Sequence, residues 1–241
     1  MIEARGQRRA LTRAYNLFSF LYGRAAAGLE REGVTRGLQR AAVQPGERVL
    51  EVAVGTGLVH ARLARRLGPS ASLPSARLPS TSSGSSLRCD RASGTSGSGL
   101  LAGVDLAPRM LRVTRRQVPG ARLARADARR LPFADGSFDL VWASYLLDLI
   151  PAEEMTPLLQ EFRRVLKAGG RLLLVNFSKN GNGLTWWERA YRVTPTLLVP
   201  YLFGGCRPVV AEPFVRAAGF AEVEREFVPG GLDSEIITAR K

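Results

Sequence analysis

The stretch Arg48-Val49-Leu50-Glu51-Val52-Ala53-Val54-Gly55-Thr56-Gly57 decides the fold of this chain. Residues 49–53 are mostly apolar and predict a buried strand, and Gly55 and Gly57 predict a tight turn after it. Beyond the turn, a helical spacing aligns four apolar residues on one side: Leu58, Val59, Leu63 and Leu67. A strand, a glycine turn and a helix in this order begin a nucleotide-binding α/β domain. The glycines let the backbone approach a ligand where a Cβ atom would collide.

The residues around the turn indicate the class of ligand. A dinucleotide fingerprint has a third Gly or Ala three residues after the second glycine, and here that position is His60. The Glu51 carboxylate would repel a pyrophosphate but suits a cofactor with an ammonium and a sulfonium, which favours S-adenosylmethionine over NAD. A purely structural glycine turn is the alternative, and His60 is expected on the helix surface.

A second acid, Asp105, ends the apolar strand that includes Gly103 and Val104. In nucleotide-binding folds, an acid about 20 residues past the glycines binds the ribose hydroxyls. The gap from Gly57 to Asp105 is 48 residues, but the 30 residues 69–98 are rich in Ser, Gly, Pro and Thr, and without them it is 18. Such a composition buries too little surface to offset its ordering entropy, so we predict a disordered insertion there.

Six segments of the chain resemble the class I S-adenosylmethionine-dependent methyltransferases, nearest the ubiquinone/menaquinone-biosynthesis C-methyltransferase family. These segments are residues 49–57, 103–111, 126–133, 137–141, 161–170 and 176–179. Alternating strands and helices by themselves predict an α/β, doubly wound, mostly parallel sheet. The resemblance implies the seven-stranded, Rossmann-like methyltransferase fold, with an antiparallel seventh strand at the sheet edge and an N-terminal helical lid.

We expect one methyltransferase domain over residues 1–241. Within it we expect a lid over 1–44, the insertion 69–98 and a substrate-side insertion over 184–208. Strands are predicted at 121–126, 138–144 and 171–177, followed by a closing antiparallel pair at 221–228 and 234–240. Helices are predicted at 108–117, 151–167 and 209–218, the second of them stopped by Gly169-Gly170.

Ligands of such sheets bind outside the carboxyl ends of the strands. We expect Asp105 to accept hydrogen bonds from the ribose hydroxyls and Asp127, with Ala128, to meet the adenine edge. The alternatives are a helix N-cap for Asp105 and a turn residue for Asp127. Met110 and Phe133 either pack on the adenine or belong to the core. The full set of predicted cofactor-binding residues is Glu51, Ala53, Gly55, Thr56, Gly57, Asp105, Leu106, Met110, Asp127, Ala128 and Ser144, the last through the resemblance.

Methyl transfer from a sulfonium needs mainly alignment of the two reactants, but methylation of a phenolic ring carbon also needs the phenol deprotonated. The sequence leaves the catalytic residue unassigned, with Tyr15, Tyr145 and Asp148 as weak candidates; Asp148 equally fits a turn. Asn16 stands where the resembling family has an acid. The substrate-side wall is expected over 185–216, and its aromatic residues suit a hydrophobic acceptor, such as a quinone precursor: Trp186, Trp187, Tyr191, Tyr201 and Phe203. Two alternatives stay open: a phospholipid amine or small-molecule thiol methyltransferase, and a non-catalytic cofactor-binding or interaction module.

The formal net charge is +14 at pH 7, and nearly all basic residues are arginines. Either the source proteome favours arginine, or the chain is attracted to an anionic membrane surface. We expect no nucleic acid partner, because no basic run is interleaved with aromatic residues. Two cysteines without metal-ligand spacing and a single histidine predict no metal site and a reducing compartment. No apolar run reaches about 18 residues, so we expect a cytoplasmic protein, with peripheral membrane contact left open.

Overall fold

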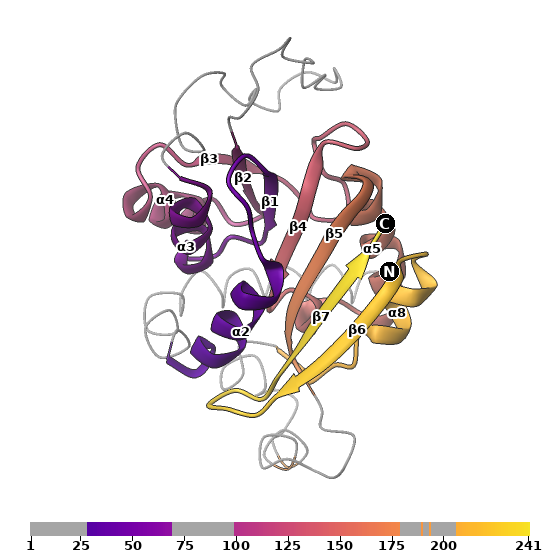
Figure 1. Ribbon diagram of the computed structural model, residues 1–241. Helices are drawn as coiled ribbons and strands as arrows, with labels where there is room; N and C mark the ends of the chain where they lie inside the picture. Colours follow the sequence, from indigo (N-terminus) through magenta and orange to yellow (C-terminus); the bar gives the residue numbers. More distant parts are fainter. Residues whose placement is uncertain (1–27, 69–98, 179–188, 190–192, 194–205) are drawn as a thin grey trace, which may run out of the picture.

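The computed structural model of the chain describes residues 28–68, 99–178, 189, 193 and 206–241. Seven strands form one sheet in the order β3-β2-β1-β4-β5-β7-β6 (Figure 1). The strands are β1 (Arg48–Val52), β2 (Leu100–Asp105), β3 (Arg122–Arg125), β4 (Phe138–Ser144), β5 (Leu166–Phe177), β6 (Ala221–Val228) and β7 (Ser234–Arg240). The first five strands pair in parallel, and β7 runs antiparallel to both β5 and β6.

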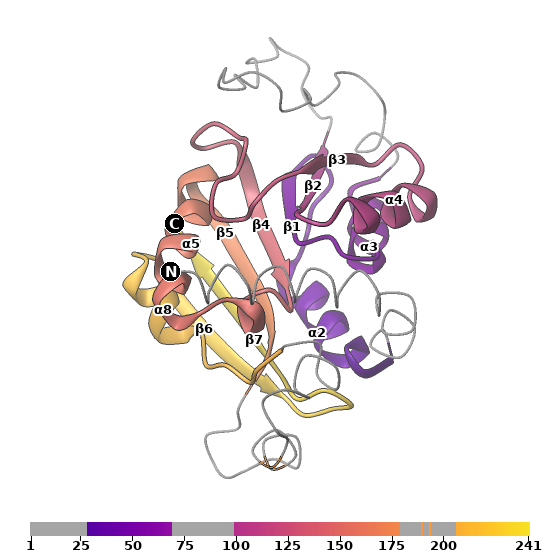
Figure 2. The same ribbon diagram turned by 180° about the vertical axis from the view of Figure 1, so that it is seen from behind.

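Helices cover both faces of this sheet (Figures 1 and 2). The helical elements are α2 (Arg31–Ala41), α3 (Leu58–Leu67), α4 (Pro108–Gln117), the 3-10 turn η2 (Leu147–Leu149), α5 (Ala152–Val165) and α8 (Glu212–Ala217). Helices α2 and α3 share one hydrophobic cluster with the sheet, and α5 and α8 share another. In the described part of the chain, no helix is long and apolar enough to cross a membrane.

The two clusters arise because successive strand side chains point to opposite faces. Leu50 and Leu174 pack toward α5 and α8. Their neighbours Val49 and Val175, together with Trp142, pack toward α2 and α3. Strands buried on both faces are near-continuously apolar, as the sequence of the central strands predicted.

The doubly wound, mostly parallel sheet is therefore confirmed, with corrections first to the limits of two helices and second to the place of the last strand. The predicted 151–167 helix ends at Val165, before the glycines, because Leu166 already pairs with Phe138 as the first residue of β5. Gly169, with φ +71°, falls inside the irregular start of that strand. The late helix, predicted over 209–218, spans only Glu212–Ala217.

The second correction concerns the last strand. The antiparallel β7 was expected at the sheet edge, but it lies between β5 and β6, so β6 is the edge. Ile236 and Ile237 are buried on opposite faces of β7. Glu222 and Glu224 of β6 are exposed, as charged side chains on an edge strand usually are. The lid before residue 28, the insertion 69–98 and the aromatic side chains expected on the substrate side lie outside the described residues.

Candidate cofactor and acceptor site

Three parallel strands bring the predicted cofactor residues to one edge of the sheet. Val52, the last residue of β1, pairs with Val104 of β2 and with Ala143 of β4. The residues that follow these three positions are Ala53, Asp105 and Ser144, and each is half-buried. The sheet thus places side chains that are far apart in the sequence at the carboxyl ends of adjacent strands, where ligands of such sheets bind.

The glycine turn after β1 takes a conformation that most residues avoid. Ala53, Gly55 and Gly57 have φ angles of +60°, +53° and +87°. A Cβ atom on Gly57 would lie 2.8 Å from the Thr114 Cγ2 atom of α4, so helix packing as well as backbone angle requires glycine there. Thr114 is a site residue that the sequence reasoning missed: its hydroxyl donates to the Gly55 carbonyl (2.9 Å). The sequence did contain a signal for this role, because Thr114 is a polar residue on the otherwise apolar side of α4.

Asp105 ties this turn to the start of α4. One of its carboxylate oxygens accepts the Gly55 N–H (2.9 Å) and the other accepts the Ala107 N–H (2.8 Å). Burial raises the pKa of Asp105, and these backbone N–H groups partly oppose that rise. The alternative that Asp105 is the N-cap of α4 is wrong, because the N-cap is Ala107, whose own N–H the carboxylate accepts. Each carboxylate oxygen keeps a second lone pair for a ribose hydroxyl. The adjacent Leu106 is 50% exposed, an apolar surface beside the predicted nucleoside position.

The prediction that His60 lies on the helix surface is wrong. His60 and Glu51 are each 1% exposed, and His60 Nδ1 lies 2.8 Å from Glu51 Oε2. His60 fits because residue 103 is glycine: a Cβ atom there would lie 3.0 Å from the imidazole Cε1. Burial raises the pKa of Glu51, while the hydrogen bond and charge of His60 partly oppose that rise. Glu51 therefore has an internal partner, and its contact with the cofactor stays a prediction.

Asp127 forms a turn and pairs with an arginine. Its Oδ1 atom accepts the backbone N–H of Arg129 (3.0 Å) and lies 3.3 Å from the Arg129 guanidinium. Arg129 also donates to Glu154 of α5 (2.7 Å), which links the turn to the helix layer. The turn reading is therefore correct. The Asp127 side chain remains 43% exposed and, with the half-buried Ala128, its contact with adenine stays a prediction.

The two residues expected to pack on adenine or in the core show different surroundings. Met110 is 4% exposed and belongs to the buried core. Phe133 is half-buried and stacks edge-to-face on Phe138, with the ring centroids 4.9 Å apart. Thr56 and Ser144 are half-buried at the edge of the sheet where the cofactor is predicted.

The three weak catalytic candidates differ in whether the structure describes them and in what they contact. Tyr15 lies outside the described residues. Tyr145, with φ +51°, places its hydroxyl 3.0 Å from the Ser234 hydroxyl of β7. Asp148 is in η2 and is 1% exposed, and its backbone carbonyl accepts the Arg207 N–H (3.2 Å). Its backbone thus takes part in a turn, as the alternative reading expected.

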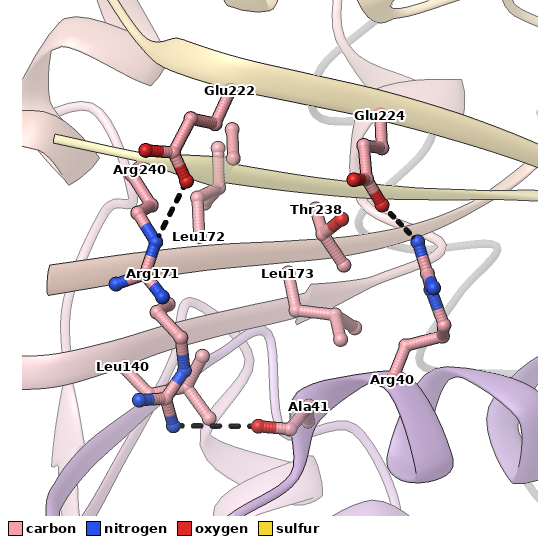
Figure 3. A pocket seen from close by; sticks show the side chains of 11 residues that line it. Arg40, Ala41, Leu140, Arg171, Leu172, Leu173, Glu222, Glu224, Thr238 and Arg240 are labelled. Carbon is pink, nitrogen blue, oxygen red and sulfur yellow. Dashed lines mark hydrogen bonds and ion pairs between the residues drawn. The ribbon is translucent and has the colours of Figure 1, made fainter.

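A groove of about 230 Å³ opens at the opposite end of the sheet (Figure 3). It lies between the end of α2, the middle of β5 and the paired strands β6 and β7. Ion pairs cross it, Arg40 with Glu224 and Arg240 with Glu222 (2.9 Å), while Arg171 donates to the Ala41 carbonyl (3.3 Å). None of the predicted cofactor residues lines this groove.

Comparison with known proteins finds methyltransferases similar to this chain. A family model described as a methyltransferase domain matches residues 82–174. The ubiquinone/menaquinone biosynthesis C-methyltransferase UbiE of Teredinibacter turnerae is 30% identical over 171 residues, covering 68% of this chain and 56% of that protein. UbiE of Ectopseudomonas mendocina is 33% identical over 165 residues, covering 66% and 53%. The chain spans about half the length of these curated relatives.

Solved structures show the same fold at low sequence identity. A methyltransferase from Thermotoga maritima superposes with a TM-score of 0.61 at 19% identity, covering 95% of this chain and 99% of that one. The 1,6-didemethyltoxoflavin-N1-methyltransferase of Burkholderia thailandensis, which has S-adenosylhomocysteine bound, gives 0.59 at 18% identity, covering 98% and 89%. The domain match, the curated relatives and the fold agree with one another, and the chain is similar to the class I S-adenosylmethionine-dependent methyltransferases.

Proposed function

We propose that this chain transfers a methyl group from S-adenosylmethionine to a small hydrophobic acceptor, and that the acceptor is a quinone precursor. The observation that carries the proposal is the Asp105 carboxylate, which holds the Gly55 N–H and the start of α4 together at the carboxyl edge of the sheet. A turn fixed in this way presents backbone groups and an acid where the cofactor of this class binds. The quinone precursor is supported by the names of the curated relatives.

In this proposal the protein contributes mainly alignment. The sulfonium of S-adenosylmethionine is already an activated electrophile, so holding the acceptor atom in line with the methyl group supplies much of the rate. The turn at 53–57 would hold the methionine part, Asp105 the ribose, and Asp127 with Ala128 the adenine. We propose that residues 1–241 act as one domain, with the lid and the 184–208 segment closing the acceptor side.

Titration calorimetry with S-adenosylmethionine and a labelled-methyl transfer screen test this proposal together. We expect binding, and transfer to a prenylated or simple quinol in preference to phosphatidylethanolamine or a thiol. Binding without transfer to any acceptor would favour a non-catalytic module, and no heat at millimolar cofactor would contradict the cofactor assignment. Transfer to phosphatidylethanolamine alone would make the chain a phospholipid amine methyltransferase.

The two helix layers differ in charge, which favours contact with an anionic lipid surface. Helices α2, α3 and α4 together carry ten arginines and one glutamate, whereas α5 and α8 carry three arginines and four glutamates. Burial and the charges of Arg31, Arg65 and Arg66 lower the pKa of Arg62, which shows that like charges crowd on this layer. We propose that the chain is cytoplasmic and attaches peripherally to membranes through this arginine-rich helix layer, where a lipid-like acceptor is concentrated.

Vesicle sedimentation tests the attachment. We expect binding to vesicles containing phosphatidylglycerol, no binding to pure phosphatidylcholine, and loss of binding in high salt. Replacing Arg65, Arg112 and Arg116 with Gln should weaken binding, while the control R163Q/R216Q on the opposite layer should not. Equal weakening by both variants would contradict a role for this layer.

A further inference from the structure

Asp148 is a buried acid without the hydrogen bonds that buried acids normally have. It lies in η2, four residues after Ser144 at the end of β4, and is 1% exposed. Both of its carboxylate oxygens are buried, and neither has a hydrogen-bond partner in the described part of the chain. Nearly all buried polar groups in folded proteins are paired, so this carboxyl group needs an explanation.

Nearby donors are engaged elsewhere. Arg207 uses its backbone N–H on the Asp148 carbonyl (3.2 Å) and its guanidinium on the Ile150 carbonyl (2.5 Å). The Tyr145 hydroxyl lies against Ser234 (3.0 Å). The surrounding structure thus holds the backbone of Asp148 firmly and leaves its carboxyl group without a partner.

Glu235 of β7 shows what a structural acid looks like in the same region. It is 0% exposed, yet it accepts hydrogen bonds from the Ala211 N–H (2.8 Å), the Asn176 amide (3.1 Å) and the Arg225 guanidinium (2.6 Å). Each of these donors comes from a different segment of the fold. The contrast indicates that Asp148 is not placed to stabilise the fold.

The charges facing Asp148 make it a stronger base. Burial raises the pKa of Asp148 well above its ordinary value, and the charges of Glu30 and Glu235 raise it further. The N–H groups of Asp148 itself and of Phe177 oppose the rise more than these two charges add to it, although neither reaches hydrogen-bond geometry with the carboxylate. Burial also raises the pKa of Glu30, which precedes α2, to about 7. A carboxylate in these surroundings has a strong tendency to take up a proton.

We infer that Asp148 is the catalytic base that accepts the proton of a phenolic hydroxyl on the methyl acceptor, an inference that rests on the proposed methyl transfer. Its position after β4 is at the carboxyl edge, where the acceptor must meet the cofactor. A donor hydroxyl would supply the hydrogen bond that the buried carboxylate lacks.

The step balances without a further reactant. The hydroxyl proton passes to the Asp148 carboxylate, and the phenolate pushes electron density onto its ring. The ring carbon forms a bond to the methyl group while the bond from methyl to sulfur breaks, its electron pair remaining on the sulfur as a neutral thioether. The methylated ring carbon then loses its proton to solvent water, which restores the aromatic ring as a phenolate. The phenolate takes back the proton held by Asp148, so the carboxylate is regenerated and one proton is released overall.

The test compares D148N with the wild type on two quinol-type phenols of matched shape. One phenol is neutral at pH 7, and its halogenated analogue is ionised at that pH. We expect D148N to lose about 10²- to 10⁴-fold in kcat on the neutral phenol and far less on the ionised one, with unchanged affinity for S-adenosylmethionine. Equal losses on both phenols, or no loss on the neutral one, would overturn the role of Asp148.

Thermal unfolding separates a catalytic from a structural role. We expect D148N to raise Tm by about 2–4 °C at pH 7.5, because it removes an unpaired buried charge. The matched variant E235Q, at a fully paired buried acid, should lower Tm. A lower Tm for D148N as well would make Asp148 a structural residue.

Glu30→Gln provides a second measurement that leaves Asp148 in place. Removing the charge of Glu30 should lower the pKa of Asp148 and move the rising limb of the kcat–pH profile to lower pH. An unmoved limb would count against Asp148 as the titrating base. If the wild type binds the cofactor but methylates no phenol, the proposed acceptor fails and Asp148's role fails with it. Activity that survives D148N refutes only the role of Asp148.

Discussion

The Glu51–His60 pair gives the sharpest stability prediction. Both side chains are buried, 2.8 Å apart, and His60 is the hydrogen-bond partner of the Glu51 carboxylate in the described structure. His60→Ala would leave a buried carboxylate without that partner. Breaking one side of a buried pair costs about 3–5 kcal/mol, and the lost imidazole leaves a cavity in addition. We therefore expect H60A to lose at least about 3 kcal/mol of unfolding free energy at pH 7.5.

The pH dependence of that loss follows from the sign of the Glu51 shift. Burial raises the folded-state pKa of Glu51 above the ordinary value of about 4.5, so between these two pKa values the folded state holds a proton that the unfolded state has released. The stability that this proton gives the folded state is fully present below pH 4.5 and is lost as the pH rises from 4.5 through the folded-state pKa of Glu51. Without His60 that pKa rises further, so the H60A penalty should be smaller at pH 5 than at pH 7.5.

Urea unfolding of the wild type, H60A, E51Q and the double variant measures both effects. We expect a coupling energy of about 1–3 kcal/mol between the two positions at pH 7.5, because they contact each other directly. Additive losses, or an H60A penalty that is the same at both pH values, would refute the reasoning.

Three further predictions concern the turn, its acid and the start of α2. Gly57→Ala should lower stability by about 1–3 kcal/mol and weaken S-adenosylmethionine binding at least about tenfold, because of the strained φ and the clash with Thr114; unchanged affinity in calorimetry would contradict it. Asp105→Ala should cost about 1–3 kcal/mol in urea unfolding, since the Gly55 N–H loses its partner, and should abolish measurable cofactor binding. Wild-type stability should fall between pH 4.5 and about 7 as the folded-state proton on Glu30 is lost. Glu30→Gln should make that fall smaller, leaving the part that Glu51 contributes, and Tm profiles of identical shape would count against it.

Local patterns in the sequence predicted the sheet and the position of the cofactor edge. Runs of apolar residues predict buried strands because strand side chains alternate across a sheet covered on both faces. Gly55 and Gly57 predicted the turn because only glycine takes its backbone angles at little cost. The helix over residues 108–117 was predicted with its correct limits. Asp105 could be placed once the 69–98 segment was left out of the spacing.

Tertiary structure decided what those residues contact. His60 was predicted on the surface. It is buried because Gly103, on the neighbouring strand, leaves room for the imidazole, and no pattern in the sequence near His60 indicates this contact. The place of β7 inside the sheet depends on which strand β5 pairs with, and antiparallel pairing of the last two segments is compatible with either order. The pattern at Asp127 was ambiguous until Arg129 was seen to pair with it.

Asp148 is the clearest example of a residue whose surroundings only the tertiary structure reveals. By itself the sequence marked it only as an acid near a turn, one of three weak candidates. Its meaning comes from the absence of a hydrogen bond to a carboxyl group that the fold buries, near Glu30 and Glu235. The sequence by itself determined the order of the strands along the chain, the glycine turn and the acids at strand ends, because these depend on residues close together in the chain. Burial and pairing depend on residues far apart, so only the tertiary structure decided which acids have internal hydrogen-bond partners and that Asp148 has none among the described residues.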